Sequence, residues 1–270
     1  MSAADHGVGR LTPAGAKHRR DREPLLLEFV GLPGAGKTAV AGRVAAELRA
    51  RGITCVERRA RRGGKDGKGR RLFQRATSLV RNYDLTLASV RFAAGVRPLR
   101  LTPLWRAFRL AGWARQLHAY AASDVEAVVL DQGPLQDLWS LTVPGRKWNE
   151  VAGRAAVRHL MQVTRMPRVL VYVNVDIETA AERLRQRGGT SSRFDRLSAI
   201  QTWTWLTQYE QSLSSIFRSA VTISNAASVR VDGRLAINEV AQEVIRFLDG
   251  ARGDSAGWIP SATVATGAVS

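Results

Sequence analysis

The sequence predicts an α/β protein in which a parallel sheet is flanked by helices, giving three layers. Two observations support this class. Short apolar runs alternate with helical patterns from residue 25 to residue 249, and a glycine-rich turn joins the first run to the first helix. Strands separated by helices form βαβ units with right-handed crossovers. The chain has 270 residues, 45% of them hydrophobic, so we expect one domain over residues 25–249.

Each expected strand is a short apolar run. The first, Leu25 to Val30, is interrupted only by Glu28 and is typical of a strand that is buried on both faces. The expected strands are residues 25–30, 53–56, 126–130, 169–173 and 229–231.

Several expected helices carry start or stop signals. Gly52 ends the first helix, Thr102 precedes Pro103 as an N-cap, and Asp176 caps the helix that holds Arg183. The expected helices are residues 37–51, 72–94, 103–122, 149–165, 177–187, 197–217 and 238–248. Residues 1–24 and 250–270 are small, polar and poorly patterned, so we expect disordered tails there.

Positive charge is concentrated in one part of the chain. The formal net charge is +18, and residues 57–115 contain 16 Lys and Arg against three acids. We expect residues 57–122 to form a basic loop and helical insert. Its helix 103–122 interleaves aromatic residues with arginines, which leaves three alternatives. The helix could pack an apolar stripe on the core, lie on an anionic membrane surface, or bind nucleic acid through residues 57–115.

The sequence contains a single cysteine, Cys55, which excludes an internal disulfide framework. No apolar run approaches the roughly 18 residues that a spanning helix needs, and the N-terminus lacks the apolar stretch of a signal peptide. We therefore expect a soluble, cytoplasmic protein.

Residues 31–38, G-L-P-G-A-G-K-T, match the phosphate-binding pattern G-x-x-x-x-G-K-[ST] between a strand and a helix. Glycines allow successive N–H groups to face phosphate oxygens, and the helix N-terminus adds its positive end. Lys37 would reach the β- and γ-phosphates, and the Thr38 hydroxyl would bind Mg²⁺. The residues expected around the nucleotide are Gly31, Leu32, Pro33, Gly34, Ala35, Gly36, Lys37, Thr38 and Ala39.

Asp131 ends the apolar run V-V-L-D. In a P-loop fold, an acid at such a strand end orients Mg²⁺ or accepts a proton from the attacking group. The structural alternative is that Asp131 caps a helix that begins near Pro134. We take Asp131 as a catalytic and metal-binding candidate.

A cluster of arginines follows the fourth expected strand. Arg183 and Arg187 are four residues apart and share a helix face, and Arg193 lies beyond Gly188 and Gly189 on a loop. Planar guanidinium groups stabilise the charge that spreads over a transferring phosphoryl group. The three arginines therefore predict a catalytic lid, although taken alone they would be an ordinary basic helix end.

Five segments in this order resemble the thymidylate-kinase-like branch of the P-loop nucleotide and nucleoside kinases. They are residues 31–38, 128–133 (V-V-L-D-Q-G), 171–188, 192–195 (S-R-F-D) and 231–240. The resemblance implies a three-layer P-loop fold, ATP and Mg²⁺, and transfer of the γ-phosphoryl group to a small-molecule acceptor. It also implies that residues 232–234, including Gly233, border the adenine. Apart from the resemblance, a homodimer is one candidate assembly.

The chain departs from this family on the acceptor side. Pro33 stands where the family usually carries an acid, Gln132 stands where it carries an arginine, and residues 57–122 replace the short acceptor-binding region. Two hypotheses follow. One is an ATP-dependent kinase for a nucleotide-like or other small anionic acceptor. The other is a nucleotide-binding switch or accessory ATPase whose basic helices engage a partner, a membrane or nucleic acid.

Overall fold

The computed structural model describes the central part of the chain with several gaps. The described residues are 23–58, 87–91, 101–142, 150–163, 166–187, 194, 197–224 and 226–253. For residues 101–109, 111, 252 and 253 the backbone is described and the side chains are not.

The described residues form a five-stranded parallel sheet of order β2-β3-β1-β4-β5. The strands are β1 (Leu25–Gly31), β2 (Cys55–Arg58), β3 (Ala127–Leu130), β4 (Arg168–Asn174) and β5 (Ala227–Asp232). Strand β1 lies at the centre, where Leu27 is in register with Val129 on one side and Val169 on the other. All seven residues of β1 are buried, which explains its nearly unbroken apolar sequence. The α/β prediction is confirmed.

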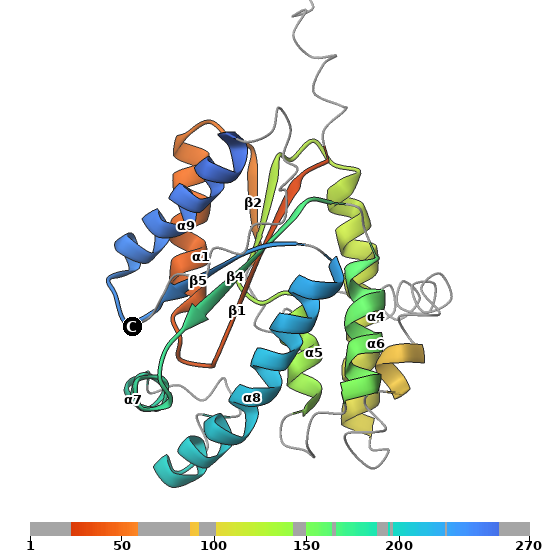
Figure 1. Ribbon diagram of the computed structural model, residues 1–270, viewed down its shortest axis with the longest axis vertical. Helices are drawn as coiled ribbons and strands as arrows, with labels where there is room; N and C mark the ends of the chain where they lie inside the picture. The colour runs from red at the N-terminus through yellow and green to blue at the C-terminus, as the bar shows by residue number, and fades with distance from the viewer. Residues whose placement is uncertain are drawn as a thin grey trace, which may run out of the picture.

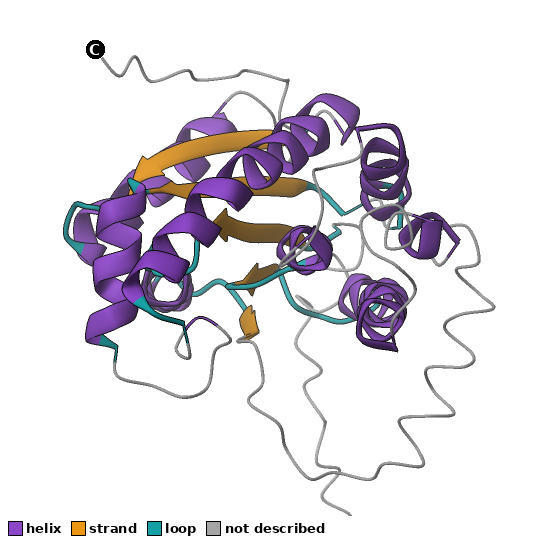
Figure 2. Ribbon diagram, turned by 90° about the horizontal axis from the view of Figure 1, so that it is seen from below, coloured by secondary structure: helices purple, strands orange, loops and turns teal. Residues whose placement is uncertain are grey.

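Helices cover both faces of the sheet (Figures 1 and 2). Helices α1 (Lys37–Ala50) and α9 (Ile237–Gly253) lie together on one face. The other face is covered by α4 (Leu101–Ala121), α5 (Pro134–Thr142), α6 (Glu150–Met161) and α8 (Ala199–Ser224). Helix α7 (Ile177–Gln186) follows the carboxyl end of β4. The P-loop and the ends of β3 and β4 therefore meet at one edge of the sheet.

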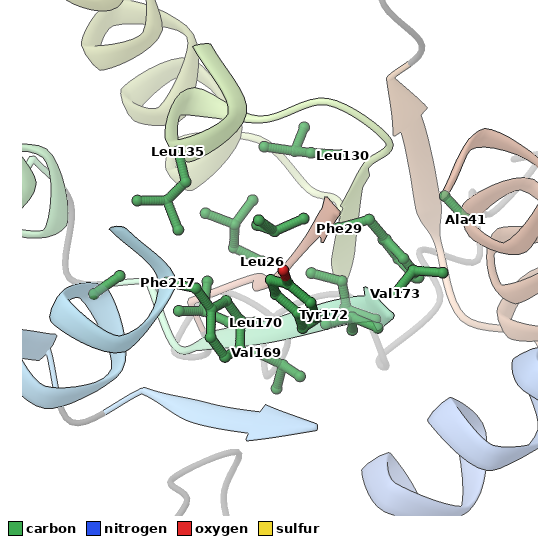
Figure 3. Packing of buried hydrophobic residues seen from close by; sticks show 14 of the residues in the cluster. Leu26, Phe29, Ala41, Leu130, Leu135, Val169, Leu170, Tyr172, Val173 and Phe217 are labelled. Carbon is green, nitrogen blue, oxygen red and sulfur yellow. The ribbon is translucent and has the colours of Figure 1, made fainter. Parts of the chain in front are cut away.

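The core is formed by strand side chains that point alternately to the two helix-covered faces of the sheet (Figure 3). Phe29 of β1 points toward Ala41 of α1, and Leu26 of the same strand points to the opposite face. On that opposite face Tyr172 packs edge-on against Phe217 of α8, with ring centroids 5.0 Å apart. Because β1 is held on both faces, its last residue, Gly31, enters the following loop from a fixed position.

Strand β2 differs from the prediction. It spans Cys55–Arg58 rather than residues 53–56, so Glu57 and Arg58 belong to the sheet and not to the basic loop. They are in register with Val129 and Leu130 of β3. Strand β2 is at the edge of the sheet, where partly exposed charged side chains are tolerated and charge is a poor guide to where a strand ends.

Helix ends also differ from the prediction. Helix α4 begins at Leu101, so Thr102 lies in its first turn and is not an N-cap. Helix α9 continues to Gly253, beyond the predicted tail boundary at residue 250. Most of the predicted tails, most of residues 57–100 and Arg193 lie outside the described residues. Among the helices that are described, none combines the length and hydropathy that crossing a membrane requires.

Candidate phosphate-binding site

The loop between β1 and α1 has the backbone conformation that its glycines predict. Gly34 and Gly36 have φ values of 89° and 90°, which side chains other than glycine rarely adopt. A Cβ atom on Gly34 would lie 2.4 Å from the carbonyl oxygen of Ala180 in α7. Position 34 is therefore both strained for other residues and packed against α7, so it has no room for a side chain.

Lys37 folds back into this loop. Its Nζ donates hydrogen bonds to the carbonyl oxygens of Gly31, at 2.9 Å, and Leu32, at 2.7 Å. Burial lowers the pKa of Lys37 to about 8, and the nearby carboxylate of Asp131 opposes that shift. An ammonium group that is held by neutral carbonyls and poorly hydrated has much to gain from a phosphate oxygen.

The two predicted metal ligands are in contact. The Thr38 hydroxyl donates a hydrogen bond of 3.0 Å to Oδ2 of Asp131, whose side chain is buried. In P-loop proteins Mg²⁺ is held by few protein oxygens, namely a hydroxyl and a carboxylate, together with substrate phosphates. This pair fits that chemistry. The alternative is that Asp131 caps the first turn of α5. In that turn the N–H of Leu135 is already bonded to Glu28 and does not need Asp131 as an acceptor.

Of the predicted lid arginines, Arg183 lies beside the P-loop. Its Nη1 donates to the carbonyl oxygen of Gly233 at 2.8 Å, and the same nitrogen is 3.9 Å from the position of a Cβ on Gly36. Arg187 is the C-cap residue of α7, one turn further on. Arg193 lies outside the described residues, and Arg183 is the arginine whose contacts place it at the loop.

The segment after β5 closes the other side of the site. A Cβ on Gly233 would lie 2.9 Å from the carbonyl oxygen of Ala35, so this glycine is packed directly against the P-loop. Next to it, Arg234 donates to Asp232 through both Nε and Nη2, with distances of 2.7 to 3.1 Å, and this ion pair lowers the pKa of Asp232. Residues 232–234 therefore lie beside the P-loop, and their role at the adenine stays a prediction.

A cation from the edge of the basic insert lies at the same end of the sheet. The Arg58 guanidinium stacks over the ring of Trp113 in α4, 4.0 Å from its centroid. Trp113 donates through Nε1 to Asp137 of α5 at 2.7 Å. The main chain of Arg58 is also linked to β3, because its carbonyl oxygen accepts the N–H of Asp131 at 3.4 Å.

Two buried polar residues of the site were not predicted. Gln136 accepts the N–H of Gly31 through Oε1 at 3.3 Å, and Glu28 accepts the N–H of Leu135 at 2.6 Å. Glu28 had a signal in the sequence, because it is the one charged residue in the first apolar run. Gln136 had none, because a glutamine in a short helix is unremarkable without its partner.

The chain is similar to one protein family in sequence and to several solved structures in fold. A family model described as an AAA domain matches residues 26–211, which is more than half of the chain. No curated protein matches. Two similar solved structures, each 14% identical in sequence, are deoxyadenosine kinase from M. mycoides with bound dATP and the protein APE1195. The first has a TM-score of 0.48 and covers 83% of this chain and 99% of its own; the second has 0.38, 85% and 97%.

The extent of the family match and the glycine-lysine-threonine loop at the end of a central parallel strand identify the same class of protein. The chain belongs to the AAA-domain family of P-loop NTPases.

Proposed function

We propose that this protein is an ATP-dependent kinase that transfers the γ-phosphoryl group of ATP to a nucleotide-like or other small anionic acceptor. The observation that carries the proposal is the convergence of Lys37, the Thr38–Asp131 pair and Arg183 around one loop. Phosphoryl transfer requires positioning and electrostatic stabilisation more than covalent chemistry, and these are the groups that provide it.

Residues 31–39 would hold the phosphates of ATP through their N–H groups and through the Lys37 ammonium. Thr38 and Asp131 would hold Mg²⁺, which neutralises charge on the phosphates when bound. In the transfer, the bond from the γ-phosphorus to the oxygen of ADP breaks and a bond to an acceptor oxygen forms. Arg183, together with Arg187 and Arg193, would stabilise the charge on the moving group.

Arg183 could serve this role without a large movement. It already lies near Gly36, and its present partner is a neutral carbonyl, that of Gly233. A guanidinium has five donors, so Arg183 can retain this bond while it donates to a phosphate oxygen. The Gly233 segment would then border the base of the nucleotide.

The acceptor is proposed to be anionic because of the charge near the site. Arg58 lies at the carboxyl end of β2, and this is the edge of a parallel sheet at which ligands bind. Residues 57–115 carry most of the excess positive charge of the chain. A small acceptor with phosphate or carboxylate groups would be attracted to this region.

A second function has one observation in its favour. Gln132 is exposed and neutral next to Asp131, and Pro33 is apolar, so neither can bind an acceptor phosphate through charge. A nucleotide-dependent switch or accessory ATPase would not need such groups. In that case the basic insert would engage a partner, an anionic membrane or nucleic acid, and a homodimer could form.

The deciding experiment measures ADP release from Mg·ATP with a panel of nucleoside monophosphates, nucleosides and phosphosugars. Lys37→Ala is the control, and thermal unfolding checks that it folds. Stimulation by one acceptor, reduced at least about 100-fold in the control, is the expected result. A slow rate that no acceptor changes would refute the kinase and favour the switch. Equal rates in wild type and Lys37→Ala would refute both.

A further inference from the structure

We propose that Glu28 is a positioning residue for the phosphate site, acting from inside the sheet on the segment that presents Asp131 and Gln136 to the P-loop. The inference rests on the nucleotide-binding part of the proposed function and does not depend on the acceptor. Glu28 accepts its hydrogen bond from Leu135, so its action on the loop 31–38 would pass through the segment 131–136.

The side chain of Glu28 is fully buried, with 0% of its surface exposed, on the central strand β1. Its Oε1 accepts the N–H of Leu135 at 2.6 Å, at the start of α5. The first N–H groups of a helix have no partner within the helix and carry its positive end, so a carboxylate is a strong acceptor for them. Glu28 therefore fixes where α5 begins.

The segment between Asp131 and α5 rests directly on this carboxylate. A Cβ atom on Gly133 would lie 2.4 Å from both Cδ and Oε1 of Glu28. Such a distance is far shorter than van der Waals contact, so a Cβ at residue 133 would displace either the Glu28 carboxylate or the segment. Any change in the volume or hydrogen bonding of Glu28 is therefore felt at this segment.

The same segment is attached to the P-loop at its two ends. At one end Asp131 accepts a hydrogen bond of 3.0 Å from Thr38. At the other end Gln136 accepts the N–H of Gly31 at 3.3 Å. Because Glu28 lies under Gly133 and Leu135, between these contacts, its position sets both of them together.

The ion pair between Glu28 and Arg168 has poor geometry. Arg168 at the start of β4 has its Nη1 3.8 Å from Oε2 of Glu28, and the same nitrogen donates to Sδ of Met161 at 3.1 Å. Within the described part of the chain, Oε2 of Glu28 and Nη2 of Arg168 make no hydrogen bond. A buried ion pair with such geometry contributes little to stability compared with apolar side chains. A role in stability alone does not explain it.

The surroundings make Glu28 responsive to pH. Burial raises its pKa to about 7, while Arg168 of β4 and the N–H of Leu135 lower it and Asp137 of α5 raises it. These are the charged and titratable groups that act on it from the packed elements. Above this pH the ionised carboxylate holds the N–H of Leu135 more strongly. Nucleotide affinity is therefore expected to rise as the pH increases through about 7.

The test is the binding of Mg·ADP by titration calorimetry, as a function of Mg²⁺ and from pH 6 to 8.5, in wild type and Glu28→Gln. Glutamine keeps the size and the acceptor oxygen and removes the charge. We expect the Mg²⁺ concentration for half-maximal binding to rise at least about fivefold and the rise in affinity near pH 7 to become less steep. The ionisation of ADP itself changes with pH in the same way in both experiments. The ratio of the two affinities at each pH therefore reports the contribution of Glu28.

The matched control is Thr142→Val, at the other end of the same helix. The Thr142 hydroxyl is buried and donates to the carbonyl oxygen of Trp139 at 2.7 Å. We expect this variant to unfold at a lower temperature with the Mg²⁺ and pH dependence of wild type. The same shifts in Thr142→Val and Glu28→Gln would overturn the proposal, because they would reflect general loosening of α5.

A second variant keeps Glu28 and disturbs its contact with the segment. Gly133→Ala introduces the Cβ that has no room, and we expect it to raise the Mg²⁺ requirement at least about fivefold. If Glu28→Gln and Gly133→Ala both fold and bind Mg·ADP as wild type does, Glu28 is not a positioning residue. If instead nucleotide binding behaves as expected and no acceptor is phosphorylated, the kinase proposal fails and this one stands.

Discussion

Arg183 of α7 and Gly233 after β5 are joined by a hydrogen bond of 2.8 Å, from the guanidinium Nη1 to the main-chain carbonyl oxygen. Both elements also press on the P-loop. The Ala180 carbonyl of α7 lies against Gly34, and Gly233 lies against the carbonyl of Ala35. Two segments therefore enclose the phosphate loop. They are hydrogen-bonded to each other although they lie 50 residues apart in the sequence.

Replacing Arg183 by lysine tests whether this contact is part of catalysis. Lysine keeps the charge, but it cannot hold the Gly233 carbonyl and a phosphate oxygen with one planar group. We expect kcat with ATP to fall about 100-fold and the KM for ATP to change less than tenfold. Steady-state kinetics of Arg185→Lys, which alters an exposed arginine paired with Glu182, provide the control. A loss of less than threefold in Arg183→Lys would remove this residue from the transfer step.

The affinity for ATP is expected to fall in alkaline solution. Burial lowers the pKa of Lys37 to about 8 in the free protein, and bound phosphates would raise it again. ATP therefore binds preferentially to the ammonium form of Lys37. The affinity for ATP has its full value below pH 8 and falls by up to about tenfold per pH unit above it. Calorimetric titrations from pH 7 to 10 measure this, because ATP is fully ionised in most of that range. Lys37→Met should bind weakly with no such fall, and a fall of equal slope in both proteins would contradict the assignment.

Two glycines with positive φ separate backbone strain from packing. Gly34 has a φ of 89° and no room for a Cβ, whereas Gly52 has a φ of 77° and nothing within 4 Å of a Cβ. Gly52→Ala should lower the free energy of unfolding by about 1 kcal/mol and leave Mg·ADP binding unchanged. Gly34→Ala should cost more and weaken Mg·ADP binding at least about tenfold. Urea unfolding and calorimetry measure the two effects, and equal behaviour of the two variants would show that the contact with Ala180 is unimportant.

The sequence predicted those parts of the fold that depend on residues close together along the chain. The central strand β1 is buried on both faces, so its apolar run was visible without knowledge of its partners. The N-cap of α7 was predicted from Asp176, whose side chain accepts the N–H of Thr179. The end of β2 was missed because Glu57 and Arg58 are held in the sheet by pairing with β3, which local propensity does not register.

The same distinction separates the parts of the site. Lys37 and Thr38 lie in one contiguous motif, so the sequence alone was enough to propose phosphate binding for Lys37 and Mg²⁺ binding for Thr38. The N–H of Leu135 donates to Glu28, 107 positions away, and the N–H of Gly31 donates to Gln136, 105 positions away. Such pairs arise from the packing of α5 on β1, and no pattern of spacing along the chain encodes them. Arg58 was predicted as part of a basic loop, and its stacking on Trp113 was visible only in the structure.

Arg58 is expected to act on the acceptor and not on ATP. Its guanidinium lies over Trp113, on the face of the sheet covered by α4 and α5, whereas the Lys37 ammonium is bonded to carbonyls of the P-loop. Arg58→Gln should raise the KM for the acceptor at least about tenfold and change the KM for ATP less than threefold. Arg51→Gln is the matched control, because Arg51 pairs with Asp249 on the other face. Once the acceptor is identified, kinetics with each substrate varied in turn give both constants. Parallel changes in the two constants would assign Arg58 to the fold rather than to the acceptor.

The contact between Thr38 and Asp131 predicts that the two side chains act on one ion. The hydroxyl and the carboxylate are 3.0 Å apart, so a single Mg²⁺ can bind both oxygens only where they now meet. Thr38→Val and Asp131→Asn should each raise the Mg²⁺ concentration for half-maximal turnover at least about tenfold. If they share the ion, the double variant should be less impaired than the two single effects combined, with a coupling energy on the order of 1 kcal/mol.

Thr207→Val is the control for this cycle. Its hydroxyl is exposed on α8 and donates to the carbonyl oxygen of Trp203 at 3.0 Å, far along the chain from the P-loop. Its Mg²⁺ dependence should equal that of wild type. Additive effects of Thr38→Val and Asp131→Asn would show that the two residues act independently. In that case Asp131 would be assigned to the acceptor, as the residue that receives its proton, and Thr38 alone would bind the metal from the protein side.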